Sequence, residues 1–121
     1  MTKGKYVDGF VLVVPKNKIS NYKKMAQLGA KIWKKYGALD YKECMIDDAK
    51  PAHVTFPFSK MMKLKKNETV WFSYIVFRSR KHRDQINAKV MKDTSMNDPM
   101  YADMPMDMKR FAYAGFKVIV D

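Results

Sequence analysis

Two carboxylates that lie within apolar stretches are the first candidates for chemistry in this sequence of 121 residues. Asp8 interrupts the run YVDGFVLVV, and Glu43 lies in the stretch YKECM. Side chains alternate across a strand, so Asp8 has apolar neighbours on its face, where loss of water raises a carboxyl pKa and suits a general base. Glu43 lies in the same cavity if its face turns inward. The alternatives are an ion pair between Asp8 and a Lys or Arg across the sheet, and a solvated Glu43 on an edge strand.

A polar motif near the end of the chain is the second candidate site. Asp107 and Arg110 lie in a loop that leads into the last apolar stretch, and Tyr113 follows on the face shared by Phe111 and Gly115. Arginine binds carboxylates and phosphates through paired hydrogen bonds, so Arg110 and Tyr113 are candidates to bind an anionic molecule. The alternative is a structural turn, stabilised by Asp107 and Arg110, that contributes subunit contacts.

Metal and thiol chemistry receive little support from the sequence. Cys44 is the only cysteine, which excludes an internal disulfide and a multi-cysteine zinc site, and His53 and His82 are 29 residues apart and fit no zinc or haem motif. Methionine thioethers suit Cu(I), but methionines also fill irregular connections well. We therefore predict no metal and no cofactor. The methionine-rich stretch contains Met91, Met96, Met100, Met104, Met106 and Met108.

The net charge of +12 makes a polyanion an alternative partner. The excess is concentrated in residues 1–36, where Lys24, Lys31 and Lys35 share one face of a predicted helix. Phosphate contacts require such a basic face, but single-strand binding also needs exposed aromatic residues, and Trp33 lies on the core-facing stripe. A solvated lysine face is the simpler interpretation, so nucleic acid is the weaker alternative.

The apolar patterns predict four strands and two helices in the order strand, helix, strand, strand, helix, strand. Strands are expected at 5–14, 38–46, 69–78 and 111–120, and helices at 18–36 and from a cap at Ser79 to about 93. Asn17 and Gly37 are expected to begin and end the first helix, and the irregular segment 47–67 contains a short stretch suited to a helical turn. The residues expected to face inward from the second helix are Ile86, Val90 and Met91.

This order predicts one α+β domain over residues 1–121, with the ferredoxin-like βαββαβ arrangement and a four-stranded antiparallel sheet. The stretch 69–78 is the most apolar and should be central. Both helices lie on one face of such a sheet, yet the strands are apolar on both faces, so the other face requires a cover. A second subunit is the simplest cover, and we expect a homodimer.

Four sequence motifs, spaced along nearly the whole chain, resemble those of a known protein family. The stretches YVDGFVLVVP, YGALDYKEC, RDQINAKVMKD and MPMDMKRFAYAGF resemble the YbaA-like family of small bacterial proteins, a domain of unknown function. The resemblance implies a dimeric α/β barrel, in which two ferredoxin-like sheets pack face to face. It implies no activity, because relatives in the wider superfamily have unrelated functions.

The sequence therefore predicts a homodimer that binds a small organic or anionic molecule in its barrel cavity. Whether it turns the molecule over as an enzyme stays open, and the alternatives are a polyanion-binding module or a purely structural dimer. The candidate ligand-binding residues are Asp8, Glu43, Arg110 and Tyr113. The chain has no stretch long enough to span a bilayer and no signal-peptide pattern, so we expect a cytoplasmic protein.

Overall fold

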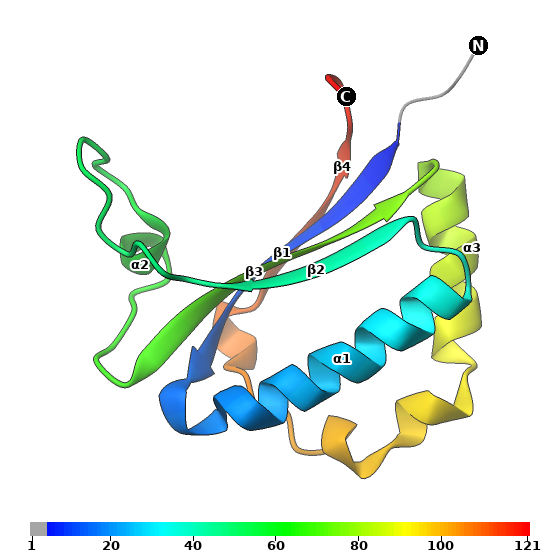
Figure 1. Ribbon diagram of the computed structural model, residues 1–121, viewed down its shortest axis with the longest axis horizontal. Helices are drawn as coiled ribbons and strands as arrows, with labels where there is room; N and C mark the ends of the chain where they lie inside the picture. Colours follow the sequence, from blue (N-terminus) through cyan, green and yellow to red (C-terminus); the bar gives the residue numbers. More distant parts are fainter. Residues whose placement is uncertain (1–4) are drawn as a thin grey trace.

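The computed structural model describes residues 5–121 and has the predicted order of elements (Figure 1). The strands and α-helices are β1 (Tyr6–Pro15), α1 (Ile19–Lys35), β2 (Asp40–Met45), α2 (Phe58–Met61), β3 (Glu68–Phe77), α3 (Arg80–Met91) and β4 (Ala112–Lys117). Short 3-10 turns lie at Lys16–Lys18, Thr94–Asn97, Pro99–Tyr101 and Met108–Arg110. No helix within residues 5–121 combines the length and apolar character that a membrane span needs.

The four strands form one antiparallel sheet in the order β2-β3-β1-β4. The stretch predicted to be central becomes β3, which pairs with both β1 and β2, and this prediction is confirmed. β4 ends at Lys117, earlier than predicted, because its last partner on β1 is Tyr6. Beyond that pair, Ile119 and Val120 are exposed.

The helix boundaries follow the predicted signals in part. Gly37 has a φ of 111° just after α1, a conformation that glycine adopts without steric cost, and Ser79 caps α3 by accepting a hydrogen bond from the His82 backbone N–H at 3.0 Å. The prediction that Asn17 caps α1 is wrong. Asn17 lies inside a 3-10 turn, so Lys18 takes the cap position and its side chain makes no capping hydrogen bond.

The two faces of the sheet have different surroundings (Figure 1). On one face α1 and α3 cover a core in which Leu12, Phe77, Ile86 and Val90 are fully or almost fully buried. On the other face, the segment around α2 covers only the end near Met62. Val11 packs beside Met62, and the Phe58 ring of α2 stacks on Phe72. The same open face also carries Val7, Tyr74, Val76 and Phe116, and both Phe72 and Phe116 are exposed.

Candidate functional site

A cavity of about 360 Å³ lies between the sheet and the helical layer of the chain. Its floor comes from the three strands β1, β2 and β3, and its cover from α1 and from the chain that follows α3. Six methionines line it, so its surface is largely thioether, aromatic and aliphatic. These methionines are Met25, Met91, Met96, Met104, Met106 and Met108.

The cavity exists because the second half of the helical layer is irregular. After α3 the chain continues through successive 3-10 turns, and Pro99 and Pro105 prevent a continuous helix there. Flexible methionine side chains therefore cover the sheet in place of a regular helix face. Met91, Met104 and Met108 are themselves exposed, so the cavity reaches the solvent between them. Met91 was expected to face inward, but it lies at this opening and is 63% exposed.

Among the residues that line the cavity, Glu43 supplies the carboxylate. The hydroxyl groups of Tyr22 and Tyr41 each donate a hydrogen bond to one of its two oxygens, at 2.8 Å in both cases. Burial raises the pKa of the Glu43 carboxyl, and these two bonds and one from Ser73 oppose that shift only in part. Glu43 is thus a desolvated carboxylate whose hydrogen-bond donors are all neutral.

Local sequence places the two tyrosines. Tyr22 lies on the buried stripe of α1, whereas Tyr41 is two residues before Glu43 on β2 and therefore shares its face. Gly29 provides the space, because a Cβ at that position would come within 2.9 Å of the Tyr41 hydroxyl oxygen. Burial raises the pKa of both tyrosines further above its ordinary value, so both remain protonated donors at neutral pH.

A second, shallower groove of about 460 Å³ lies between α1 and β2 and shares residues with the cavity. Glu43, Tyr41 and Ala26 line both. Lys23 lies at the solvent side of this groove and is exposed. Glu43 therefore occupies the boundary between an apolar cavity and a solvent-exposed groove.

Asp8 lies on the same helix-covered face but has a different environment. Its side chain is only 3% exposed and forms an ion pair of 2.8 Å with Arg83, which extends from α3. Burial raises the pKa of Asp8, and the positive charge of Arg83 is the largest opposing influence. The partner comes from a helix rather than from across the sheet, a distinction that the sequence pattern did not contain.

Tyr113 belongs to this ion-pair cluster. Its hydroxyl accepts a hydrogen bond of 2.7 Å from Arg83, and its ring stacks on Phe10, with the centroids 4.8 Å apart. The Tyr6 ring lies beside the Arg83 guanidinium at 5.0 Å, and Gly115 is needed next to it, because a Cβ there would lie 2.3 Å from the Tyr6 hydroxyl oxygen. The face of Tyr113 was expected to line the barrel. It instead turns towards α3.

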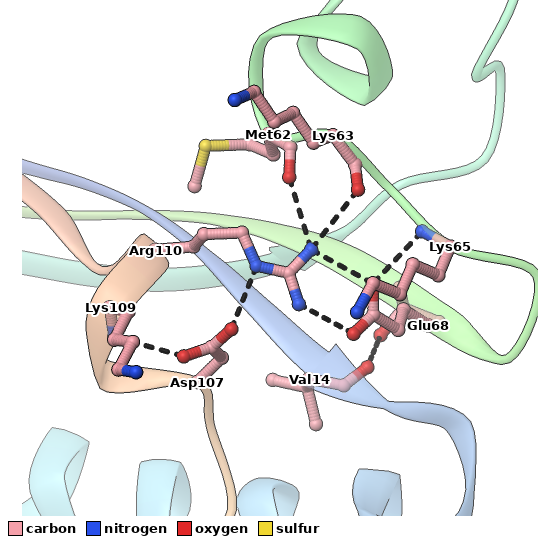
Figure 2. Close-up of polar contacts among 9 residues, drawn as sticks. Val14, Met62, Lys63, Lys65, Glu68, Asp107, Lys109 and Arg110 are labelled. Atoms are coloured by element: carbon pink, nitrogen blue, oxygen red, sulfur yellow. Dashed lines mark hydrogen bonds and ion pairs between the residues drawn. The ribbon is translucent and has the colours of Figure 1, made fainter.

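The guanidinium of Arg110 forms its hydrogen bonds with other residues of the chain (Figure 2). Its guanidinium donates two hydrogen bonds to Glu68, one to Asp107 and two to the backbone carbonyls of Met62 and Lys63. All three guanidinium nitrogens thus have partners. Arg110 connects the turn before β4 to the chain between α2 and β3, which agrees with the alternative of a structural turn.

The remaining candidates lie away from the cavity opening. Lys24 and Lys31 are exposed on α1, and Lys35 pairs with Asp93 at 3.3 Å, so the polyanion site stays a prediction. Cys44 is exposed, and His82 accepts a hydrogen bond from the Arg78 backbone N–H. Residues 5–121 contain no cluster of three or more His, Cys, Asp or Glu side chains suited to a metal ion.

Sequence reasoning missed the pairing of Tyr22 with Glu43. The available signals were the place of Tyr22 on the buried stripe and the i to i+2 spacing of Tyr41 and Glu43. Only the packing of α1 against β2 brings the two tyrosines to opposite oxygens of one carboxylate. Such a contact between residues 21 positions apart leaves no periodic pattern.

Comparison with protein families and curated proteins identifies relatives over most of the chain. Residues 5–108 match the family described as "Protein of unknown function (DUF1428)". The protein YbaA of Escherichia coli strain K12 and that of Shigella flexneri, both described as uncharacterized, are each 42% identical over 117 residues, which cover 97% of this chain and 98% of theirs.

Solved structures share the fold at low sequence identity. A dimeric ferredoxin-like protein from an uncultured marine organism matches with a TM-score of 0.61 and 11% identity, over 98% of this chain and 99% of that one. A proposed antibiotic biosynthesis monooxygenase from Nitrosomonas europaea gives 0.60 and 11%, over 98% and 94%. At this identity the likeness establishes the ferredoxin-like fold, and no activity follows from it.

Proposed function

This chain belongs to the DUF1428 family, and we propose that it is a homodimer that binds a small, mainly apolar organic molecule in the cavity beside Glu43. One observation carries the proposal: a cavity of about 360 Å³ lined mainly by methionine and aromatic side chains, with one carboxylate at its floor. Binding sites for small molecules combine an apolar lining with a few placed polar groups in this way.

The lining indicates the chemistry of the ligand. A volume of about 360 Å³ lies at the lower end of the range for ligand pockets, which fits a molecule of one or two rings. The thioether side chains adapt to different shapes. Glu43 accepts hydrogen bonds, so the ligand should carry a hydroxyl or amino group. The residues that line the cavity include no Lys or Arg, which favours a neutral or cationic ligand over an anionic one.

The proposed site lies on the other face of the sheet from the barrel cavity that the sequence predicted. In a face-to-face dimer the barrel interior is formed by the open faces of the sheets. Glu43, Asp8 and Tyr113 lie on the opposite, helix-covered face. Each subunit would therefore hold its own ligand.

The exposed apolar side chains on the open face of the sheet are the basis for proposing a dimer. Phe72 and Phe116 are 44% and 56% exposed there, amid further apolar side chains, and such a patch on a sheet favours burial against another protein. A second copy presents the same surface, and one protein of the same fold is described as dimeric. Sedimentation velocity should show a dimer that Phe72→Lys converts to a monomer, whereas the exposed-helix variant Lys31→Glu should remain dimeric. A wild-type monomer would contradict the dimer.

The binding proposal is tested by native mass spectrometry of gently purified protein. We expect an extra mass of a few hundred daltons or less per subunit, in line with the cavity volume. Ala26→Leu places three more carbons at the wall of the cavity and should remove that mass. If wild type carries no added mass, and neither benzylamine nor indole at millimolar concentration binds it, the ligand site is refuted.

A further inference from the structure

We propose that Glu43 acts as a general base that removes a proton from carbon in an apolar molecule held in the cavity. The inference rests on the proposed ligand binding and adds a reaction to it. The substrate class is a carbon acid, an apolar molecule in which the proton lies next to an electron-withdrawing group. Three features of the structure support this role: the fixed position of the carboxylate, its surroundings and its connection to solvent.

The carboxylate is held in one orientation. Tyr22 on α1 and Tyr41 on β2 donate to different oxygens of Glu43, at 2.8 Å each. A carboxylate has four lone-pair sites on its two oxygens, so one acceptor site remains after the two tyrosines and Ser73 have donated. The two hydroxyls come from separate elements and prevent rotation of the carboxylate. A base fixed in this way needs little reorganisation when a substrate arrives.

The surroundings strengthen the base. Water stabilises a free carboxylate, and the apolar lining of the cavity provides little to replace it. Tyr22, Tyr41 and Ser73 are neutral donors, and among residues 5–121 no cation takes part in the hydrogen bonds of Glu43. Burial raises the pKa of Glu43, which makes its anion a better proton acceptor. Carboxylates in apolar sites act as acids and bases near neutral pH for this reason.

The boundary position of Glu43 gives the proton an exit. Once Glu43 has taken a proton from a molecule in the cavity, it must release that proton before the next cycle. The groove between α1 and β2 reaches the same side chain from the solvent side. Water in this groove can accept the proton while the cavity stays apolar.

The test uses 5-nitrobenzisoxazole, a small apolar carbon acid that reports base strength in apolar sites. The carboxylate of Glu43 takes the proton from C3. The electron pair of that C–H bond forms the nitrile, the ring N–O bond breaks, and its electron pair leaves on the oxygen. The product is the yellow 2-cyano-4-nitrophenolate, and no other reactant is needed. Wild-type protein should accelerate its release with saturation kinetics.

The decisive variant is Glu43→Gln, which keeps the shape of the side chain and removes the base. We expect it to lower the turnover rate by about 100-fold or more, the usual contribution of a general base. Asp40→Asn on the same strand is the control and should leave the rate unchanged, because Asp40 pairs with Lys42 away from the cavity. If Glu43→Gln does not fold, as judged by circular dichroism, Glu43→Asp replaces it and should lower the rate by withdrawing the carboxylate.

Binding is measured separately with 3-methyl-5-nitrobenzisoxazole, which lacks the reacting proton. If this compound binds wild type by calorimetry and 5-nitrobenzisoxazole is not turned over, the role of Glu43 as a base is refuted while the ligand site stands. If neither compound binds and no turnover occurs, the role of Glu43 as a base is refuted, and the benzylamine and indole measurements decide the ligand site separately. Turnover that persists in Glu43→Gln assigns the reaction to another group and overturns the inference.

Discussion

Asp8 and Glu43 are carboxylates on the same face of one sheet, Asp8 buried and Glu43 partly buried, and their surroundings differ. Asp8 lies against the cation Arg83, with the buried ring of Tyr6 and the half-exposed ring of Tyr113 beside the pair. Glu43 lies against a cavity, and only neutral groups donate to it. Burial raises the pKa of both carboxyls, but a charge opposes the shift at Asp8 alone.

The difference teaches how to distinguish a structural carboxylate from a candidate functional one. A buried charge that has a charged partner holds two elements together, here β1 and α3. A partly buried carboxylate that has neutral donors and lies beside a cavity retains its capacity to accept a proton or a ligand. Sequence patterns mark both residues equally, and only the structure separates them.

The largest expected effect is on the Asp8 side. Arg83→Met removes the cation and leaves the Asp8 carboxylate buried without a charged partner. We expect the free energy of unfolding to fall by about 3–5 kcal/mol, the usual cost of breaking a buried ion pair. Urea denaturation measures this, with Arg80→Met on the exposed side of the same helix as the control. A loss below about 1 kcal/mol would remove the structural role that we assign to the pair.

The second effect tests how tightly the Asp8 cluster is packed. Gly115→Ala should lower the free energy of unfolding by about 1–3 kcal/mol, because the added Cβ would lie 2.3 Å from the Tyr6 hydroxyl oxygen. The double variant Tyr6→Phe/Gly115→Ala should recover part of that loss, since the nearest clashing atom is gone. Equal stability of the single and double variants in urea would show that the strain lies elsewhere.

The third prediction adds a larger volume, three carbons instead of one, on the Glu43 side. Ala26 is buried in the core at the edge of the cavity, and that cavity can take up the added side chain of Ala26→Leu, so the free energy of unfolding should change by less than about 1.5 kcal/mol. Thermal and urea denaturation measure the change. Destabilisation of 3 kcal/mol or more would mean that the space beside Ala26 cannot accept a side chain, which would weaken the contrast.

The smallest effect concerns pH. The folded-state pKa of Glu43 is raised, so the folded protein binds this proton more tightly than the unfolded chain does. The contribution of Glu43 to stability is therefore most favourable below about pH 4.3, the ordinary pKa of Glu, and declines as pH rises towards the raised value. Glu43→Gln should flatten this decline in urea titrations across that window. An identical pH profile for the variant and wild type would contradict the raised pKa.

Much of the fold was predictable because it depends on local patterns. Apolar, β-branched runs predicted the four strands, and the cap at Ser79 and the stop at Gly37 were correct. The register of β1 against β4 was not predictable, so the predicted last strand extended beyond the end of β4. Asn17 was a suitable cap by residue type, but a 3-10 turn displaced the start of α1.

The candidate site was predictable only as a set of residues. Glu43 and Asp8 stood out as polar residues in apolar strands, but the sequence did not say which sheet face they occupy. The guanidinium of Arg110 is suited to binding an anionic ligand. In the structure it donates two hydrogen bonds to the carboxylate of Glu68, which is distant in the sequence. The methionine-rich stretch suggested either ligands for a soft metal ion or side chains that pack an irregular connection. Five of its six methionines line one cavity, a fact that depends on the path of an irregular segment.

The most direct measurement of the central claim is an NMR titration of protein labelled with ¹³C at the methionine methyl groups. Benzylamine, which is apolar and carries an amino group for Glu43, serves as the probe. We expect shifts for the methyls of Met25, Met96 and Met106, which line the cavity, and none for Met61 and Met62 near α2, which do not. Shifts confined to Met61 and Met62, or none at any methionine up to millimolar benzylamine, would contradict a ligand site beside Glu43.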